Sequence, residues 1–137
     1  ILPPISPNIG VWPTEPGADP LGGFLESCTR LLGPAERDAP LVLPGHGAPF
    51  TGAAFRLRQL AENHLSALDR IEAAISGRAM TAVELFPVIF RREIGAGETG
   101  LAIAEAVAHL NRLGAEGRAE AVEDAAGALR WRSARAG

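Results

Sequence analysis

A short apolar run that stops abruptly at a glycine-rich loop constrains this chain more than any other stretch. Leu41-Val42-Leu43 lies between two prolines and is followed closely by Gly45-His46-Gly47. An apolar run bounded in this way predicts a brief buried strand. The two glycines reach backbone angles that other residues avoid, so the loop can turn sharply and present the imidazole of His46 at the end of the strand.

Two interpretations of His46 follow from the local pattern. A neutral imidazole that a tight loop presents in this way can bind a metal ion through one ring nitrogen. The same side chain can instead form a hydrogen bond with its own backbone. The local pattern alone favours this second interpretation, because one histidine does not make a metal site.

The wider sequence adds a family resemblance. Pro44-Gly45-His46-Gly47, with Pro49 shortly after, resembles the last metal-ligand loop of the metallo-β-lactamase-fold hydrolases. Residues 1–10, ILPPISPNIG, resemble the segment that follows the metal-bridging aspartate in the same superfamily. The rest of the chain resembles the helical, winged-helix-like C-terminal extension of one branch of the family, which includes an endoribonuclease-like enzyme.

This resemblance implies a fold and a division of the chain. The fold class is α+β and mostly helical. Residues 1–51 would be the end of an αββα metallo-β-lactamase sandwich. Residues 52–137 would form a helical, winged-helix-like C-terminal domain, entered through a long linking helix over about residues 52–76.

The resemblance also implies an activity. Two metal ions, zinc by family precedent, would activate a water that attacks an ester, thioester, lactam or phosphodiester. His46 is the metal ligand that it implies in this chain. The His-x-His-x-Asp-His motif, a further histidine and the bridging aspartate of the family are missing. We therefore expect the C-terminal portion of a longer enzyme, whose missing N-terminal part is its partner, and we expect this fragment alone to be inactive.

Two other functions stay open. A winged helix could bind nucleic acid through a helix in the major groove, which requires arginine or lysine contacts to phosphates. The extension could instead be structural, covering the hydrolase core or forming a homodimer. A small molecule or RNA is the expected substrate of the parent enzyme.

Composition narrows these choices. A length of 137 residues suits one domain, or a small domain with an appendage. The net charge of −3 provides no electrostatic argument for nucleic acid. No apolar run is long enough to span a membrane, and the single Cys28 fits a reducing, cytoplasmic compartment. Basic residues that are all arginine, with many alanines and glycines, indicate a GC-rich bacterial genome by association.

Apolar side chains recur at helical spacing in the first half of the chain. One helix is predicted from Pro20, capped by Asp19, to its end at Gly33-Pro34. Cys28 lies on its apolar face and is interpreted as a small core residue. On the long helix His64 lies on the apolar face, either as a buried core histidine or as a second-shell group near the metal ions.

The second half predicts shorter elements. Thr81-Ala82-Val83-Glu84 fits a capping box that starts a short helix, and Pro87 should end or kink that helix near Phe86. A further helix is predicted over residues 99–113, with a solvated outer face that holds Glu105, His109 and Arg112. Residues 118–123 and 128–133 flank a turn and predict a β-hairpin. The N-terminal residues 3–20 predict a loop, anchored on a core by Ile9 and Trp12.

Overall fold

The structure is a computed structural model that describes residues 7–90 and 92–134, and it divides the chain into two compact units. The first unit comprises Gly22–Leu65 with the described part of Ile1–Asn8. The second comprises Ile9–Leu21 with the described part of Ser66–Gly137. Helix α2, Ala53–Gly77, begins in the first unit and ends in the second. The division after residue 51 that the family resemblance implies stays a prediction.

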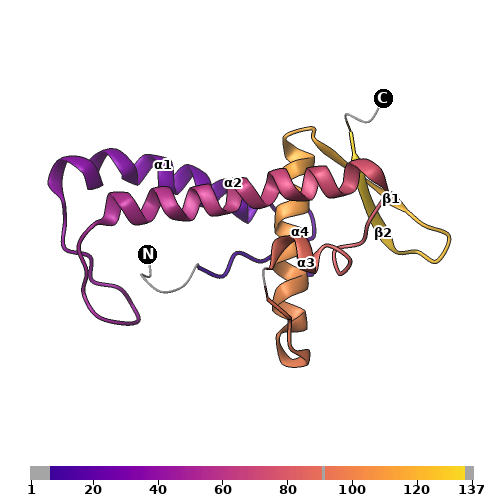
Figure 1. Ribbon diagram of the computed structural model, residues 1–137, viewed down its shortest axis with the longest axis horizontal. Coiled ribbons are helices and arrows are strands. Elements are labelled where there is room, and N and C mark those ends of the chain that lie inside the picture. The colour runs from indigo at the N-terminus through magenta and orange to yellow at the C-terminus, as the bar shows by residue number, and fades with distance from the viewer. Residues whose placement is uncertain (1–6, 91, 135–137) are drawn as a thin grey trace. The chain divides into compact units, whose positions relative to one another are not determined.

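Two antiparallel helices form the first unit. They are α1, Pro20–Asp38, whose first two residues belong to the second unit, and the N-terminal half of α2 (Figure 1). Phe24 of α1 contacts His64 of α2, whereas Glu36 near the end of α1 pairs with Arg58 near the start of α2, so the helices run in opposite directions. Their buried contact is a small apolar cluster of Cys28, Ala35, Ala53 and Leu57. The prediction that Cys28 is a core residue is confirmed.

Helix α1 continues beyond its predicted end. Pro34 lies inside the helix, so the predicted stop at Gly33-Pro34 is wrong. An internal proline removes one backbone donor and crowds the preceding turn. Ala35, the next residue, is only 8% exposed and belongs to the cluster with α2. Packing against α2 therefore outweighs the local stop signal.

The second unit is mostly helical and ends in a two-stranded antiparallel sheet (Figure 1). After α2 the chain forms α3, Phe86–Ile89; η1, Ala96–Glu98; α4, Thr99–Ala115; β1, Ala119–Glu123; and β2, Leu129–Ser133. The hairpin was predicted within one residue at each end, and Glu120 lies opposite Arg132 in its register. Met80 extends the pairing by a single antiparallel bridge to Trp131.

The core of the second unit lies between the C-terminal half of α2, α3 and α4. Its fully buried large apolar side chains include Leu68, Ile71, Ile75, Leu85, Leu110 and Leu113, and Leu21 at the start of α1 is also fully buried. The N-terminal segment lies along α4, because the Val11 amide donates to the Ala104 carbonyl oxygen and the Asn111 side chain donates to the Pro16 and Ala18 carbonyl oxygens. Ile9 anchors this segment as predicted, but Trp12 is 70% exposed, so its predicted role as an anchor is wrong.

Local signals around α3 are only partly confirmed. The capping box forms, since the Thr81 amide donates to Glu84 at 2.8 Å and the Glu84 amide donates to the Thr81 hydroxyl at 3.3 Å. The helix itself begins four residues later than expected for that box, at Phe86. Pro87 does not end it, because Pro87 occupies its first turn, where a missing amide donor costs nothing. Among the described residues, no helix is long and apolar enough to cross a membrane.

Candidate functional site

The His46 loop belongs to the first unit and is closed by one pair of backbone hydrogen bonds. The Val42 amide donates to the Phe50 carbonyl oxygen at 2.8 Å, and the Phe50 amide donates back at 3.1 Å. This isolated antiparallel bridge replaces the predicted strand over residues 41–43. Leu41 is 61% exposed and Leu43 is 74% exposed, so the prediction of a buried strand is wrong within this chain. Val42 alone packs against the cluster between α1 and α2.

The loop presents His46 to solvent. Gly47, which follows it, has a φ of +86°, a left-handed conformation that favours glycine. His46 is exposed, and no described residue forms a hydrogen bond or ion pair with its ring. The alternative in which His46 bonds its own backbone is therefore not found among the described residues. An exposed imidazole is accessible to a metal ion, as a ligand must be before it binds.

The loop by itself offers one metal ligand. Within the described part of its own unit, His46 does not gather with two other histidine, cysteine, aspartate or glutamate side chains. A catalytic zinc needs about three protein ligands. The residues present therefore fit a metal only as a single contributor, and the other ligands would have to come from elsewhere.

His64, the predicted second-shell residue, lies on the buried face of α2. It is 5% exposed, and its ring meets the ring of Phe24 edge to face, with centroids 5.6 Å apart. Its predicted place on the apolar stripe is confirmed. A role beside a metal stays a prediction.

Helix α4 contains a second buried imidazole, that of His109, whose predicted position on the helix was wrong. His109 was expected on a solvated outer face, but it is 1% exposed. Its Nδ1 lies 2.8 Å from the backbone carbonyl oxygen of Glu105, one turn earlier, so the neutral ring carries its proton on Nδ1. The missed signal was its spacing from Ala106 and Leu113, which places it on the buried stripe.

Burial shifts both titratable groups of this turn toward their neutral forms. It lowers the pKa of His109, although the hydrogen bond with Glu105 opposes the shift. It raises the pKa of the half-buried Glu105 carboxyl, and the nearby charge of Arg92 partly offsets this effect. Burial therefore favours the neutral ring of His109.

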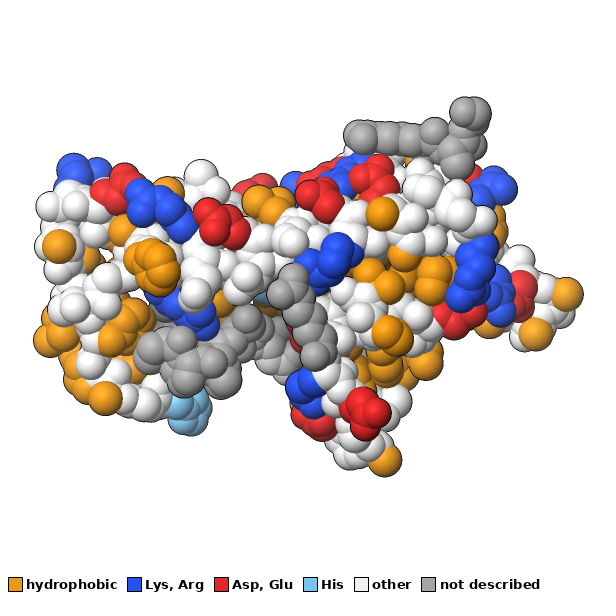
Figure 2. Space-filling model, viewed as in Figure 1, with side chains coloured by type: hydrophobic (Ala, Val, Ile, Leu, Met, Phe, Trp, Pro, Cys, Tyr) orange, Lys and Arg blue, Asp and Glu red, His pale blue; other side chains and the backbone are white. Residues whose placement is uncertain are grey.

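The hairpin does not form a basic surface. Arg130 donates to Asp124 at 2.8 Å and to Glu84 at 3.0 Å, and Arg132 donates to Glu120 at 2.7 Å. On the face drawn in Figure 2, acidic and basic side chains lie next to one another instead of separating by sign. Phosphate binding needs cations that are not already paired.

Comparisons with known proteins show similarity to the metallo-beta-lactamase family. Residues 68–134 match the family described as metallo-beta-lactamase-like, C-terminal domain. A comparison with curated proteins finds no match. Among solved structures, the chain is similar to a beta-lactamase domain protein from Burkholderia ambifaria, with 36% sequence identity and a TM-score of 0.90. It is also similar to a metallo-beta-lactamase family protein from Thermus thermophilus, with 30% identity and a TM-score of 0.75.

These two similarities cover nearly all of this chain but less than half of each solved chain. They cover 97% and 96% of this chain, but only 38% and 39% of the two solved chains. The 137-residue chain therefore spans less than half the length of the structures that it matches. Its second unit is a mostly helical α+β domain with a two-stranded sheet, similar to metallo-beta-lactamase C-terminal domains.

Proposed function

We propose that this chain is the C-terminal portion of a metal-dependent hydrolase of the metallo-β-lactamase superfamily. The observation that carries the proposal is the similarity to the Burkholderia ambifaria protein, at 36% identity and a TM-score of 0.90 over 97% of this chain. The match of residues 68–134 to a metallo-beta-lactamase-like C-terminal domain supports it independently.

In this proposal His46 is a metal ligand, and zinc is the metal. The support from this chain is the exposed imidazole on a loop closed by the Val42–Phe50 bridge. Since the first unit contributes one ligand, the upstream part of the parent protein would supply the others. The bound metal would lower the pKa of a water so that hydroxide forms near neutral pH. His46 would hold the metal, and its flanking glycines would let the loop position the ring.

The test uses the intact parent protein and compares His46→Ala with Asn63→Ala. Asn63 is an exposed residue of α2 in the same unit and serves as the matched control. We expect His46→Ala to lose a large part of the bound zinc, measured by mass spectrometry of the metal, and to lose hydrolysis by at least about 100-fold. Asn63→Ala should keep both. Full zinc content and full activity in His46→Ala would exclude His46 as a ligand.

The same proposal makes a prediction for the 137-residue chain alone. It should bind zinc weakly and show no turnover of ester, thioester, lactam or phosphodiester substrates, because a single ligand does not hold a catalytic metal. Adding zinc in excess should not change this result. Turnover by the purified chain that survives further purification would contradict the proposal. The same substrate panel, applied to the intact parent, would identify the substrate class.

A second candidate is a winged-helix-like module that binds nucleic acid. The order of helices followed by a hairpin, with Met80 bridged to Trp131, supports the shape. The charges argue against the function, because Arg130 and Arg132 on the hairpin are engaged by carboxylates. Binding of the chain to duplex DNA or RNA that weakens steeply with salt would favour this candidate, and no binding at low salt would dismiss it.

A further inference from the structure

The loop that presents His46 connects α1 to α2 within the first unit. The chain leaves α1 through Ala39, whose φ is +40°, and enters α2 through Gly52, whose φ is +87°. A left-handed conformation is unfavourable for alanine, because its Cβ atom lies too close to the carbonyl oxygen that follows. Strain of this kind persists only where surrounding contacts fix the backbone, and it is frequent at functional sites. Contacts within the first unit must therefore hold this loop in place.

Those contacts gather at Val42. Its amide donates to the Phe50 carbonyl oxygen at 2.8 Å, and its carbonyl oxygen accepts from the Phe50 amide at 3.1 Å. This bridge closes residues 43–49 into a loop, and His46 lies at the centre of the loop. The half-buried Val42 side chain packs against the cluster of Cys28, Ala35, Ala53 and Leu57. One residue thus joins the loop to the packing of α1 against α2.

Alternation along the extended segment explains why Val42 has this role and its neighbours do not. Successive side chains of an extended chain point to opposite sides. Val42 contacts the cluster, whereas Leu41 and Leu43 are 61% and 74% exposed. Residues 45–49 are all exposed. Within the described part of the unit, no hydrogen bond or ion pair joins residues 43–49 to other segments.

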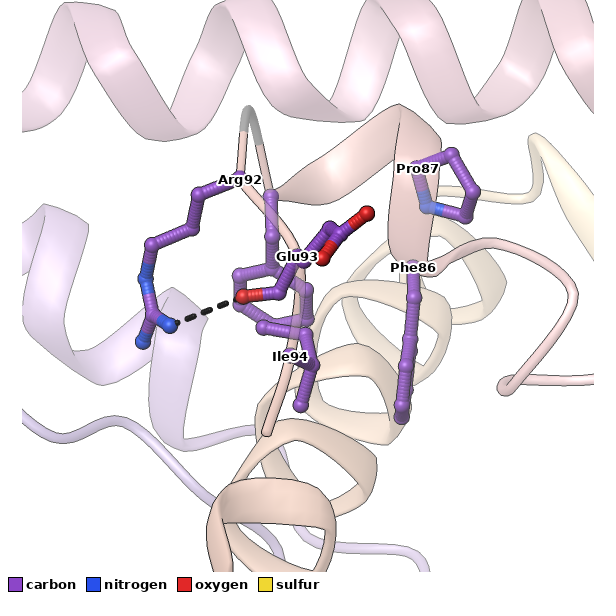
Figure 3. Close-up of a pocket in the computed structure, with 6 residues that line it drawn as sticks. Phe86, Pro87, Arg92, Glu93 and Ile94 are labelled. Carbon is purple, nitrogen blue, oxygen red and sulfur yellow. Dashed lines mark hydrogen bonds between the residues drawn. The ribbon is translucent and has the colours of Figure 1, made fainter. Parts of the chain in front are cut away.

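A loop of the second unit is held in a different way. Arg92, in the connection between α3 and η1, donates to the two carboxylate oxygens of Glu98 at 2.8 and 2.6 Å. Figure 3 shows that its guanidinium also reaches the backbone carbonyl oxygen of Glu93, at 3.1 Å. Residues 43–49 contain no aspartate, glutamate, lysine or arginine. Charged pairs of this kind therefore do not hold the His46 loop.

We propose that Val42 is a positioning residue for His46, so that metal binding and the packing of α1 against α2 are coupled. The inference rests on the proposed function, in which His46 is a metal ligand. Groups that orient a metal ligand change metal affinity by about 10- to 100-fold when they are replaced. The coupling is reciprocal, because a metal that binds only the closed loop also stabilises the cluster beneath it.

The first test needs no metal and uses the 137-residue chain. Cys28, the single cysteine of the chain, is 4% exposed in the cluster, so a thiol reagent labels it only when the cluster opens. Val42→Ala removes two methyl groups and should speed this labelling by about fivefold. Val42→Ile keeps a branched apolar side chain and should label at the parent's rate. An unchanged rate in Val42→Ala would overturn the proposal.

Val88→Ala is the matched control for this test. It makes the same substitution at a half-buried valine of α3, in the second unit. Labelling of Cys28 should proceed at the parent's rate in this variant. Faster labelling equal to that of Val42→Ala would show a general loss of stability and would contradict a specific role of Val42.

The second test measures the zinc affinity of the intact parent protein by competition with a chromophoric chelator. Val42→Ala should bind zinc at least about tenfold more weakly, whereas Val42→Ile and Val88→Ala should bind it as the parent does. Parent affinity in Val42→Ala, together with a loss of zinc in His46→Ala, would overturn the positioning role and leave the proposed function intact. Full zinc content in His46→Ala would overturn both.

Protection of the thiol distinguishes positioning from general stability. In the intact parent, saturating zinc should slow the labelling of Cys28 by about tenfold or more, measured by mass spectrometry of the peptide that contains it. His46→Ala should show no such protection, because its loop no longer binds the metal. Equal protection in the parent and in His46→Ala would show that zinc acts through other ligands, and it would contradict the coupling.

Discussion

The guanidinium group of Arg118 binds three carboxylates of the second unit. It donates to Glu72 at 2.5 and 2.9 Å, to Asp69 at 2.7 Å and to Glu116 at 3.1 Å. The arginine side chain is 16% exposed and that of Glu72 is 19% exposed, so water screens this pair less than a surface pair. These bonds, led by the one to Glu72, raise the pKa of Arg118. The residue ties α2 to the turn after α4.

Replacing Arg118 by alanine should therefore destabilise the second unit. We expect Arg118→Ala to lower the free energy of unfolding by about 2 kcal/mol, because Glu72 is left partly buried without its charge partner. Arg132→Ala is the control, since its pair with Glu120 is 57% and 50% exposed. That variant should change stability by less than about 0.5 kcal/mol. Urea titrations of both variants measure the difference, and equal losses would contradict the argument.

His109 adds a dependence of stability on pH. Burial lowers its pKa in the folded chain below the ordinary value of 6.5. The unfolded chain then binds more protons whenever the pH lies between the two values. The stability that the neutral ring contributes is complete above pH 6.5 and is lost as the pH falls toward the folded pKa. Glu105 acts with the opposite sign, because its raised pKa favours the folded state at low pH.

A His109→Asn variant isolates this effect. Between pH 7 and pH 5 the parent chain should lose more unfolding free energy than His109→Asn does. The difference between the two losses should be about 1.4 kcal/mol for each unit by which folding lowers the pKa of the His109 ring. Glu105 is present in both chains and largely cancels. A pH dependence in His109→Asn that is identical to the parent's would refute a buried neutral imidazole.

Local contacts determine where α4 ends, whereas packing against α2 determines where α1 ends. Helix α4 ends at Ala115, two residues beyond the predicted range, where Gly117 adopts a φ of +66° and the Gly117 and Arg118 amides donate back to the carbonyl oxygens of Gly114 and Leu113. Helix α1 passes through Gly33-Pro34 although both residues favour a stop. A helix held by packing against a partner can thus contain residues that weaken it locally.

Gly33 should therefore be a site where alanine stabilises the chain. A Cβ atom there would meet only the flexible end of Arg37, at 3.6 Å. We expect Gly33→Ala to raise the free energy of unfolding by about 0.5–1 kcal/mol, since glycine costs that much inside a helix. Gly52 precedes α2 with a φ of +87°, so Gly52→Ala should destabilise by about 1–2 kcal/mol. Chemical denaturation measures both, and the same sign for both variants would contradict the helical environment of Gly33.

At the scale of the whole molecule, the first unit has a small apolar core and several large apolar side chains that are exposed to solvent. Its apolar cluster contains four buried residues, all small except Leu57, and α2 adds the buried Leu60 and His64. Large apolar side chains remain open to solvent, with Leu43 74% exposed, Phe55 70% exposed and Leu41 61% exposed. Isolated apolar residues on a surface are ordinary, but several on one small unit indicate a surface that another part of a protein covers.

The chain alone should therefore self-associate. Sedimentation velocity at micromolar concentrations should detect species larger than a monomer, and Leu43→Ser should shift the distribution toward the monomer. Leu129→Ser is the control, because Leu129 is 58% exposed but lies on the hairpin of the second unit. A parent chain that remains monomeric at every concentration would count against the argument. An equal effect of both variants would place the association elsewhere.

Several features of the fold could be predicted because they depend on neighbours in the sequence. Local backbone chemistry accounts for the start of α1 at Pro20, the capping box at Thr81 and the hairpin. The stripe of α2 followed from helical spacing. The His46 loop also turns on glycine, as its sequence indicates.

By itself, the sequence determined where the backbone can turn, cap and continue, because those choices depend on the few residues on either side. Only the tertiary structure decided which side chains lose contact with water. In the tertiary structure α1 continues past Pro34, His109 is buried, and Trp12, Leu41 and Leu43 are exposed. These outcomes depend on packing between segments far apart in the chain, and burial free energy is proportional to the apolar area that such packing removes from water.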